Sequence, residues 1–396
     1  MPSTHRQAPV VAVLGVMMIF TWGSSYYLMA VLAQPIAQDT GWALEWITAA
    51  LALGLVIAGL ISPAAGRVIS HYGGRPVLAS GCLLIASGLM VLSLANSLHV
   101  FALGWILMGL GMAAGLYDPA FSTLGHLYGI DARAAITQLT LWGGFASTVC
   151  WPLSAYLLDH FGWRGVCLAY AVILIVLILP VVLRFVPALS VEKAPEYRGW
   201  HKPDGVLEHS LNERLFILLM SLLLVLHGLV AVNVALWVFT LLEAQAVPVE
   251  KAIFYAALIG PAQVAARLLE MMARGRHHPL WTLAASVSLI AMGMLCLLFG
   301  GVAAAFALIL FGAGNGLHSI ARGALPLAVI GAERYPLVMG ELARPALIAQ
   351  ASAPILGALV LRLTGADGLA IALIGLAVAN FMIFLLLWRG VRFTSI

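Results

Sequence analysis

An arginine, Arg267, lies deep inside an apolar run of the sequence between residues 253 and 272. A charged side chain in a bilayer core is costly, so it persists only where it faces a bundle interior or a wet cavity, usually with a partner. With a rise of ~1.5 Å per residue, a helix entering the membrane at residue 253 would place Arg267 ~21 Å into a ~30 Å hydrocarbon core. The fork of donors on a guanidinium suits a carboxylate or another planar anion. This position therefore predicts a binding site for a small organic anion inside a membrane.

Two polar residues share the helical stripe of Arg267. Gln263 lies four residues before it and Glu270 three residues after it, and these spacings bring side chains to one face of a helix. One interpretation makes Arg267 the clamp for a substrate carboxylate, with Gln263 beside it. The other makes Arg267 the partner of Glu270 in an internal ion pair. Both can hold if a bound anion competes with Glu270 for the guanidinium.

Five further polar residues inside apolar runs are candidate substrate contacts. Ser25 and Tyr26 lie past the middle of the first run, although a serine can also bond back to its own helix. His227 lies ~18 Å along its run, and Asn315 and His318 share one face of another run. Polar groups at such depths should face protein or water rather than lipid. His227 can contact substrate or carry a proton, because imidazole titrates near neutrality; a packing role is the alternative.

Charged residues gather near one end of the predicted helices, where ion pairs could hold that side closed. The candidate gating or coupling residues are Asp118, Glu270, Arg75, Arg133 and Arg344. We expect Asp118 to pair with Arg133 or Arg75, with proton transport as the alternative role. For Glu270 we expect a gate or an ion pair, because nearby Arg267 would favour the charged form of its carboxylate.

The composition excludes an ordinary soluble protein. The 396 residues are 63% hydrophobic and 9% charged, with a mean hydropathy of +1.04, whereas a soluble domain carries about a quarter charged residues. The net charge of +4 is spread among connecting segments, so no nucleic-acid-binding patch is expected. No residue pattern typical of an enzyme, a metal site or a phosphate-binding loop occurs, and we expect neither catalysis, nor a metal, nor a cofactor.

Twelve apolar runs of about 20 residues predict an all-α membrane protein. They are roughly 10–33, 47–69, 77–96, 100–121, 134–158, 165–186, 214–239, 253–272, 281–299, 303–321, 343–363 and 369–388. The longest polar interruption divides them six and six. We therefore predict an N-terminal six-helix bundle at 1–186, a linker at 187–213 and a C-terminal six-helix bundle at 214–396. The first run is too long for the core of a signal peptide, and we interpret it as the first span.

The distribution of basic residues predicts the orientation in the membrane. Of 20 lysines and arginines, only Arg164, Lys251 and Arg362 fall in segments on one side of the predicted spans. Apart from the embedded Arg267, the others fall on the opposite side. Because basic segments tend to stay in the cytoplasm, both termini and the linker are expected there. The membrane is expected to be the plasma membrane, here a bacterial inner membrane.

The two predicted halves echo each other. A Gly-x-x-x-Gly pattern begins at Gly111 and again at Gly312. Arg67 precedes Arg267 by a similar interval of about 200 residues. Two repeats that enclose a central substrate site are a common plan of secondary transporters.

A turn after the second run resembles the signature of the major facilitator superfamily. It reads Gly66-Arg-Val-Ile-Ser70-His71-Tyr-Gly-Gly-Arg75, where the superfamily has Gly-x-x-x-Asp-Arg/Lys-x-Gly-x-Arg/Lys. The glycines and the last arginine match, but Ser70 replaces the aspartate and His71 the basic residue. The resemblance implies twelve transmembrane helices in two six-helix bundles, the major facilitator fold, which alternate access by rocking around a central site.

Several segments resemble more narrowly the monocarboxylate transporter branch, in its bacterial type. They are Gly23-Ser-Ser25-Tyr26, Trp46-Ile-Thr48, Tyr72-Gly-Gly-Arg75, Gly109-Leu-Gly-Met-Ala113 with Pro119-Ala120, Phe161-Gly-Trp-Arg-Gly165 and Val264-Ala-Ala-Arg267. By this resemblance, Arg267 matches the arginine of that branch that binds the substrate carboxylate. Two positions depart from the branch. Gln263 stands where it has an acidic residue, and Ala30 stands where some members have a lysine implicated in proton coupling.

The resemblance implies a secondary active transporter of a small organic anion. A monocarboxylate is the expected substrate, a proton is a candidate coupling ion, and the transporter is expected to be a monomer in the lipid bilayer. The alternative function is export of drugs or other toxic compounds. The segment 143–152 lacks the glycine and proline pattern of drug:proton antiporters, which argues against this alternative. A sensor built on a transporter-like fold is a third possibility.

Overall fold

The computed structural model describes residues 7–188, 211–273 and 277–390, and within these ranges it consists of helices joined by short turns, with no β-strand. The predicted all-α class is confirmed. Nine stretches of the described residues are long and apolar enough to cross a membrane. Two of these stretches, Leu98–Phe185 and Tyr335–Gly390, are long enough to contain several of the predicted spans. The count of twelve spans remains a prediction.

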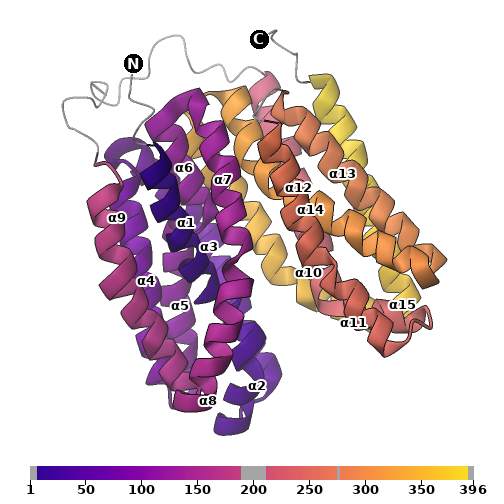
Figure 1. The fold of residues 1–396 in the computed structure, drawn as a ribbon, viewed down its shortest axis with the longest axis horizontal. Helices are drawn as coiled ribbons and strands as arrows, with labels where there is room; N and C mark the ends of the chain where they lie inside the picture. Colours follow the sequence, from indigo (N-terminus) through magenta and orange to yellow (C-terminus); the bar gives the residue numbers. More distant parts are fainter. Residues whose placement is uncertain (1–6, 189–210, 274–276, 391–396) are drawn as a thin grey trace. The chain divides into compact units, whose positions relative to one another are not determined.

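The described residues form two compact units, whose helices are labelled in Figure 1. The first unit takes its described residues from Met1–Leu189 and Gly331–Ala351, and the second from Ser190–Ile330 and Ser352–Ile396. The predicted linker at 187–213 lies mostly outside the described residues. The predicted division into bundles at 1–186 and 214–396 remains a prediction.

The first unit contains nine α-helices along the chain before residue 189. They are α1 (Gln7–Gly23), α2 (Leu28–Thr40), α3 (Leu44–Tyr72), α4 (Gly74–Ser93), α5 (Leu98–Gly115), α6 (Tyr117–Tyr128), α7 (Ala132–Gly144), α8 (Ala146–Val172) and α9 (Leu179–Phe185), with a 3-10 turn at Gly129–Asp131 and a π-helical turn at Ile173–Ile178.

The second unit contains the helices α10 (Leu211–Ala244), α11 (Val249–Ala257), α12 (Ile259–Met272), α13 (Pro279–Cys296) and α14 (Gly301–Ile330), with a 3-10 turn at Leu297–Phe299. The last helix, α15 (Tyr335–Gly390), begins in the first unit and continues in the second. Gly365 interrupts it with a φ of +72°, a left-handed conformation that glycine adopts without strain.

Four predicted spans are each divided into two helices; the span at 134–158 divides at Phe145 and the span at 253–272 divides at Leu258. The first predicted span divides at residues 24–27, where the N–H of Tyr27 bonds to the carbonyl of Trp22 at 3.0 Å, five residues back. The fourth predicted span divides at Leu116, whose backbone is extended (φ −99°, ψ −161°). Pro119 follows in the first turn of α6, where its missing N–H costs no hydrogen bond. Asp118 therefore begins a new helix and does not continue the one that carries Gly111.

Glycines bring the helices of the first unit into backbone contact. A Cβ added to Gly111 on α5 would lie 2.6 Å from the backbone nitrogen of Ile85 on α4. A Cβ on Gly109 would lie 2.5 Å from the carbonyl oxygen of Gly54 on α3. Small residues allow this close approach in a bilayer, where lipid gives no hydrophobic drive to helix association. These glycines therefore serve as close helix-packing contacts.

The second unit uses glycines in a corresponding way. Gly312 on α14 approaches Ile259 on α12, with 2.5 Å between an added Cβ and the Ile259 carbonyl oxygen. Gly314 approaches α13, with 2.8 Å between an added Cβ and the carbonyl oxygen of Ser286. Helix α14 thus contacts α12 and α13 as α5 contacts α3 and α4. This correspondence supports the internal repeat indicated by the sequence.

The beginning of α15 packs against α3 within the first unit. A Cβ added to Gly66 on α3 would lie 2.3 Å from the carbonyl oxygen of Pro336, and one added to Gly340 would lie 2.5 Å from that of Ser62. Glycines on both helices therefore permit direct backbone contact. This contact explains why residues 331–351 belong to the first unit although they come late in the sequence.

We predict that Gly111→Leu destabilises the protein and that Gly260→Leu does not. Any side chain at Gly111 must displace the backbone of α4, which costs about 1–3 kcal/mol or more, whereas Gly260 has no atom within 4 Å of an added Cβ. The melting temperature in detergent should fall by several degrees in the first variant only. Equal melting temperatures in both variants would contradict the packing described here.

Candidate functional site

Arg267 lies in the interior of the second unit, on α12, with 7% of its surface exposed. Its Nε donates a hydrogen bond to Oγ of Ser319 at 3.2 Å and lies 3.4 Å from the carbonyl oxygen of Gly316. Its Nη1 is buried and has no hydrogen-bond partner within the described ranges. No carboxylate of the described residues forms an ion pair with it. The guanidinium therefore carries a buried charge with unused donors.

The close approach of α12 to α14 places this guanidinium. A Cβ on Gly316 would lie 2.5 Å from the carbonyl oxygen of Gln263, so the two backbones touch at this level. Arg267 follows Gln263 by one turn, and Ser319 follows Gly316 by nearly one turn. The side chain of Arg267 consequently reaches Ser319 across the helix contact. Gln263 is half-buried and contributes its backbone to this contact.

Glu270 does not pair with Arg267, which corrects one of the two interpretations of this stripe. Its Oε1 accepts a hydrogen bond from Oγ1 of Thr282 at 2.8 Å and lies 3.2 Å from Nε2 of His277. The carboxylate therefore faces the start of α13, whereas the guanidinium of Arg267 faces α14. Three residues of helix separate the two side chains by enough rotation to reach different neighbouring helices.

His227, Asn315 and His318 meet in the core of the second unit. Nε2 of His227 on α10 lies 3.0 Å from Oδ1 of Asn315 on α14. The rings of His227 and His318 stack with their centroids 3.4 Å apart and their planes at 14°. All three predicted site residues are thus brought together. Their assignment to the substrate remains a proposal.

Ser25 and Tyr26 lie at the break between α1 and α2 in the first unit. Oγ of Ser25 donates to the carbonyl of Thr21 one turn earlier, the back-bonding that a serine favours inside a helix. The ring of Tyr26 packs edge-on against Trp22, with 5.5 Å between centroids. Trp22 also lies 5.3 Å from the ring of Tyr117. An aromatic cluster therefore surrounds the helix break.

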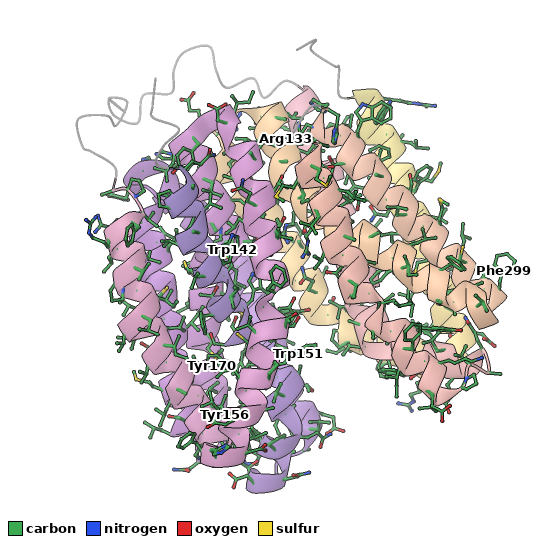
Figure 2. The ribbon with its side chains drawn as sticks, viewed as in Figure 1. Arg133, Trp142, Trp151, Tyr156, Tyr170 and Phe299 are labelled. Atoms are coloured by element: carbon green, nitrogen blue, oxygen red, sulfur yellow. The ribbon has the colours of Figure 1, made fainter. Side chains whose placement is uncertain are left out.

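Three more rings extend this aromatic cluster. Tyr27 packs edge-on against Trp151 of α8, which is labelled in Figure 2, with 6.2 Å between centroids. Tyr117 stacks on Phe121 at 5.1 Å and 17°. The spacing of aromatic residues in the sequence did not indicate this cluster, because its members come from three helices, α1, α6 and α8, and from the break that follows α1.

The predicted gating residues of the first unit lie on four helices. Asp118, in the first turn of α6, lines a small pocket with Ser62, Gly66, Ser122 and Gly340, among others. Arg75 lies in the first turn of α4, Arg133 on α7 and Arg344 on α15. Asp118 and the glycine contact between α3 and α15 thus share one pocket. The gating roles of these residues remain predictions.

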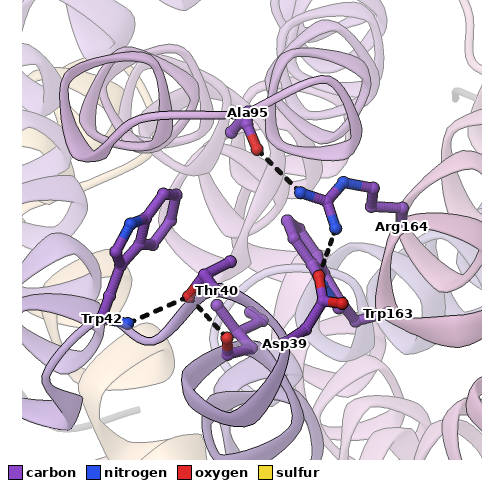
Figure 3. A network of polar contacts seen from close by, with 7 residues as sticks. Asp39, Thr40, Trp42, Ala95, Trp163 and Arg164 are labelled. Atoms are coloured by element: carbon purple, nitrogen blue, oxygen red, sulfur yellow. Dashed lines mark hydrogen bonds and ion pairs between the residues drawn. The ribbon is translucent and has the colours of Figure 1, made fainter.

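A polar network at one end of the first unit was not anticipated from the sequence (Figure 3). Nε1 of Trp163 donates to Oδ2 of Asp39 at 2.8 Å, and Arg164 forms an ion pair with the same oxygen. Nη2 of Arg164 also donates to the carbonyl of Ala95 at 3.0 Å. Gly162, with a φ of +67°, turns the chain so that these two side chains reach α2. The one sequence feature that could have indicated this network is the segment 161–165, which contains Trp163 and Arg164 and resembles the transporter branch.

A family model described as the Major Facilitator Superfamily matches residues 14–343, which is most of the chain. The chain belongs to the major facilitator superfamily. Its nine apolar stretches and its membership of this superfamily make it an integral, multi-pass membrane protein.

Within the superfamily, the chain is similar to monocarboxylate transporters. It is 32% identical over 138 residues to monocarboxylate transporter 11 of Mus musculus, a match that covers 33% of this chain and 28% of the mouse protein. It is 26% identical over 292 residues to monocarboxylate transporter 3 of Rattus norvegicus, covering 70% of this chain and 58% of the rat protein. The matches therefore span less than two thirds of these relatives.

Solved structures of superfamily members share the fold. The human organic anion transporter MFSD10 superposes with a TM-score of 0.73 at 16% identity, covering 96% of this chain and 99% of that one. The proton:xylose symporter XylE superposes with a TM-score of 0.74 at 12% identity, covering 98% and 96%. At these identities the likeness shows the superfamily fold alone.

We predict that Arg267→Met leaves the melting temperature unchanged or raises it. A buried charge without a carboxylate partner costs desolvation energy, and apolar replacements of similar volume are often neutral or stabilising by ~1–4 kcal/mol. An internal ion pair with Glu270 would instead lose its cation and leave a buried carboxylate unpaired. A fall in melting temperature that Glu270→Gln reverses would restore the ion-pair interpretation.

Proposed function

We propose that this protein is a secondary active transporter that moves a small organic anion, a monocarboxylate, across the plasma membrane by alternating access. The observation that carries the proposal is the buried guanidinium of Arg267, whose Nη1 has no partner in the described part of the chain. A planar carboxylate can accept two parallel hydrogen bonds from one guanidinium. A bound anion would therefore supply the acceptor and the countercharge together.

The comparisons support this substrate class. Relatives of the chain are named as monocarboxylate transporters, and a structure of the same fold is named as an organic anion transporter. These names favour an anion over the amphipathic compounds of a drug exporter, the alternative function. Ser319 beside Arg267 adds a hydroxyl that can contact the same anion.

We predict that carboxylate binding depends on Arg267. In a thermal-shift screen against small monocarboxylates such as pyruvate and benzoate, a ligand at 100 times its Kd should stabilise the wild type by ~2.7 kcal/mol. Arg267→Met should abolish the shift. Arg267→Lys should weaken binding by roughly 30-fold or more, because an ammonium lacks the planar fork of donors.

The matched control for this screen is Arg362→Met, because Arg362 is an exposed arginine on α15. It should retain the wild-type shift. Binding of a carboxylate with unchanged affinity by a folded Arg267→Met protein would falsify the anion-clamp hypothesis.

We further propose twelve spans with both termini and the segment 187–213 in the cytoplasm, the orientation that the basic residues favour. Reporter fusions after Arg392 and within 187–213 should therefore report the cytoplasm. A fusion at Asp367 should report the opposite side. A reporter signal from the external side at 187–213 would contradict this topology.

A further inference from the structure

The stacked imidazoles of His227 and His318 are not among the contacts of Arg267 on which the proposed function rests. They are 8% and 3% exposed, respectively, and their ring centroids lie 3.4 Å apart. Nδ1 of each ring is buried and has no hydrogen-bond partner within the described ranges. Buried polar atoms in native proteins are nearly always hydrogen-bonded. Two neighbouring exceptions point to a ligand that the pair can accept.

Asn315 determines which nitrogen of His227 is free to accept that ligand. Its amide oxygen, 3.0 Å from Nε2 of His227, can only accept a hydrogen bond. Nε2 of His227 therefore carries the proton of the neutral ring, and Nδ1 carries the lone pair. A proton added to Nδ1 would leave the hydrogen bond to Asn315 intact, because both nitrogens of a charged imidazole are donors.

The two imidazoles can bind one proton between them but not two. Two positive rings separated by 3.4 Å would repel each other strongly in a low-dielectric interior, so the rings titrate as a unit. Arg322, four residues after His318 on α14, is a charged residue whose field reaches both rings, and it opposes a positive charge on either of them. On α12, Arg267 is directed to Ser319 and Gly316 of α14. On α13, the neutral Ser286 bonds to the carbonyl of Gly314.

One helix connects this pair to the anion site. Asn315 and His318 on α14 contact α10, and the next residues along the chain, Gly316 and Ser319, contact Arg267. A shift or rotation of α14 that changes one set of contacts must therefore change the other. A proton at the pair and an anion at Arg267 would act on the same rigid element, which is the physical requirement for coupling.

We propose that His227 and His318 together form a binding site for a single proton, and that this proton is coupled to anion movement. The proton comes from water and occupies a ring-nitrogen lone pair, and its release regenerates the neutral pair. The coupling rests on the proposed transport function, whereas the proton site does not.

A proton count on purified protein tests the site without any substrate. Protons bound between pH 8 and pH 4 are counted by titration for the wild type, His227→Gln, His318→Gln and the double variant. A shared site predicts no loss in either single variant, because the remaining ring takes the proton, and a loss of one proton in the double variant. Two independent histidines would lose one proton in each single variant and two in the double. A double variant that loses none would show a pair closed to protons, and either of these last results would overturn the proposal.

Two controls accompany the count. His160→Gln removes an exposed histidine on α8 whose Nδ1 contacts the carbonyl of Tyr156, and the difference between the double variant and the wild type should be the same with and without this substitution. If the double glutamine variant does not fold, His227→Phe/His318→Phe keeps the stacked rings and removes both titrating groups. The same loss of one proton is expected.

Coupling is tested with [14C]pyruvate in proteoliposomes. A one-unit pH gradient coupled one to one can sustain an accumulation of about tenfold. The double variant should lose this accumulation but retain pyruvate exchange at equal pH, while Arg267→Met should lose both. Accumulation that persists in the double variant, or a wild type that exchanges but never accumulates, would overturn the coupling. A wild type that moves no pyruvate in either assay counts against the proposed function, and the proton count then decides the site alone.

Discussion

The close approach of α12 to α14 through glycine determines where the buried charge of this protein can lie. With Gly316 against the backbone of Gln263, α12 lies close enough to α14 for the side chain of Arg267 to reach Ser319. A larger residue at either glycine of α14 would separate the helices and let the guanidinium turn toward lipid or solvent. Packing of the smallest residues thus controls the position of one of the largest.

Helix α14 carries residues of the proposed anion site on one face and residues of the imidazole pair on another face. Successive residues of an α-helix differ by about 100° around its axis. Gly316 and Ser319 therefore face α12, while Asn315 and His318, one residue earlier in each case, face α10. The anion site and the imidazole pair are neighbours along the chain but lie on different faces of α14. This arrangement allows a single movement of α14 to act on both sites without direct contact between the groups.

Much of the fold could be predicted from the sequence, because apolar runs of sufficient length have few alternatives to membrane helices. The breaks at residues 24–27 and at Leu116 could not, since glycine, serine and proline occur inside continuous membrane helices as well. The spacing of Arg267 and Glu270 allowed an ion pair as one of two interpretations, but the two side chains face different neighbouring helices. Their helix lies between two partners, and Thr282 and Ser319 draw the two side chains apart.

The internal repeat in the sequence does not predict which of two corresponding residues is buried. Arg67 and Arg267 occupy echoing positions, yet Arg67 is exposed and Arg267 is buried. The stacking of His227 on His318 depends on how α10 and α14 are rotated about their axes relative to each other. The sequence of either helix alone does not indicate this rotation. Pairwise helix packing, rather than the residue types themselves, decides which polar groups become a site.

The charge balance of the buried groups suggests why binding should precede closure. Relative to the branch that it resembles, the chain lacks one acidic and one basic residue, at Gln263 and Ala30, and these changes cancel in net charge. Arg267 is then left without a resident counterion among the described residues. Removing the last water from an unpaired guanidinium is unfavourable, whereas removing it from a guanidinium–carboxylate pair costs much less. On the proposed function, the empty carrier therefore resists enclosing its site, and the arriving carboxylate removes that resistance by supplying the missing charge.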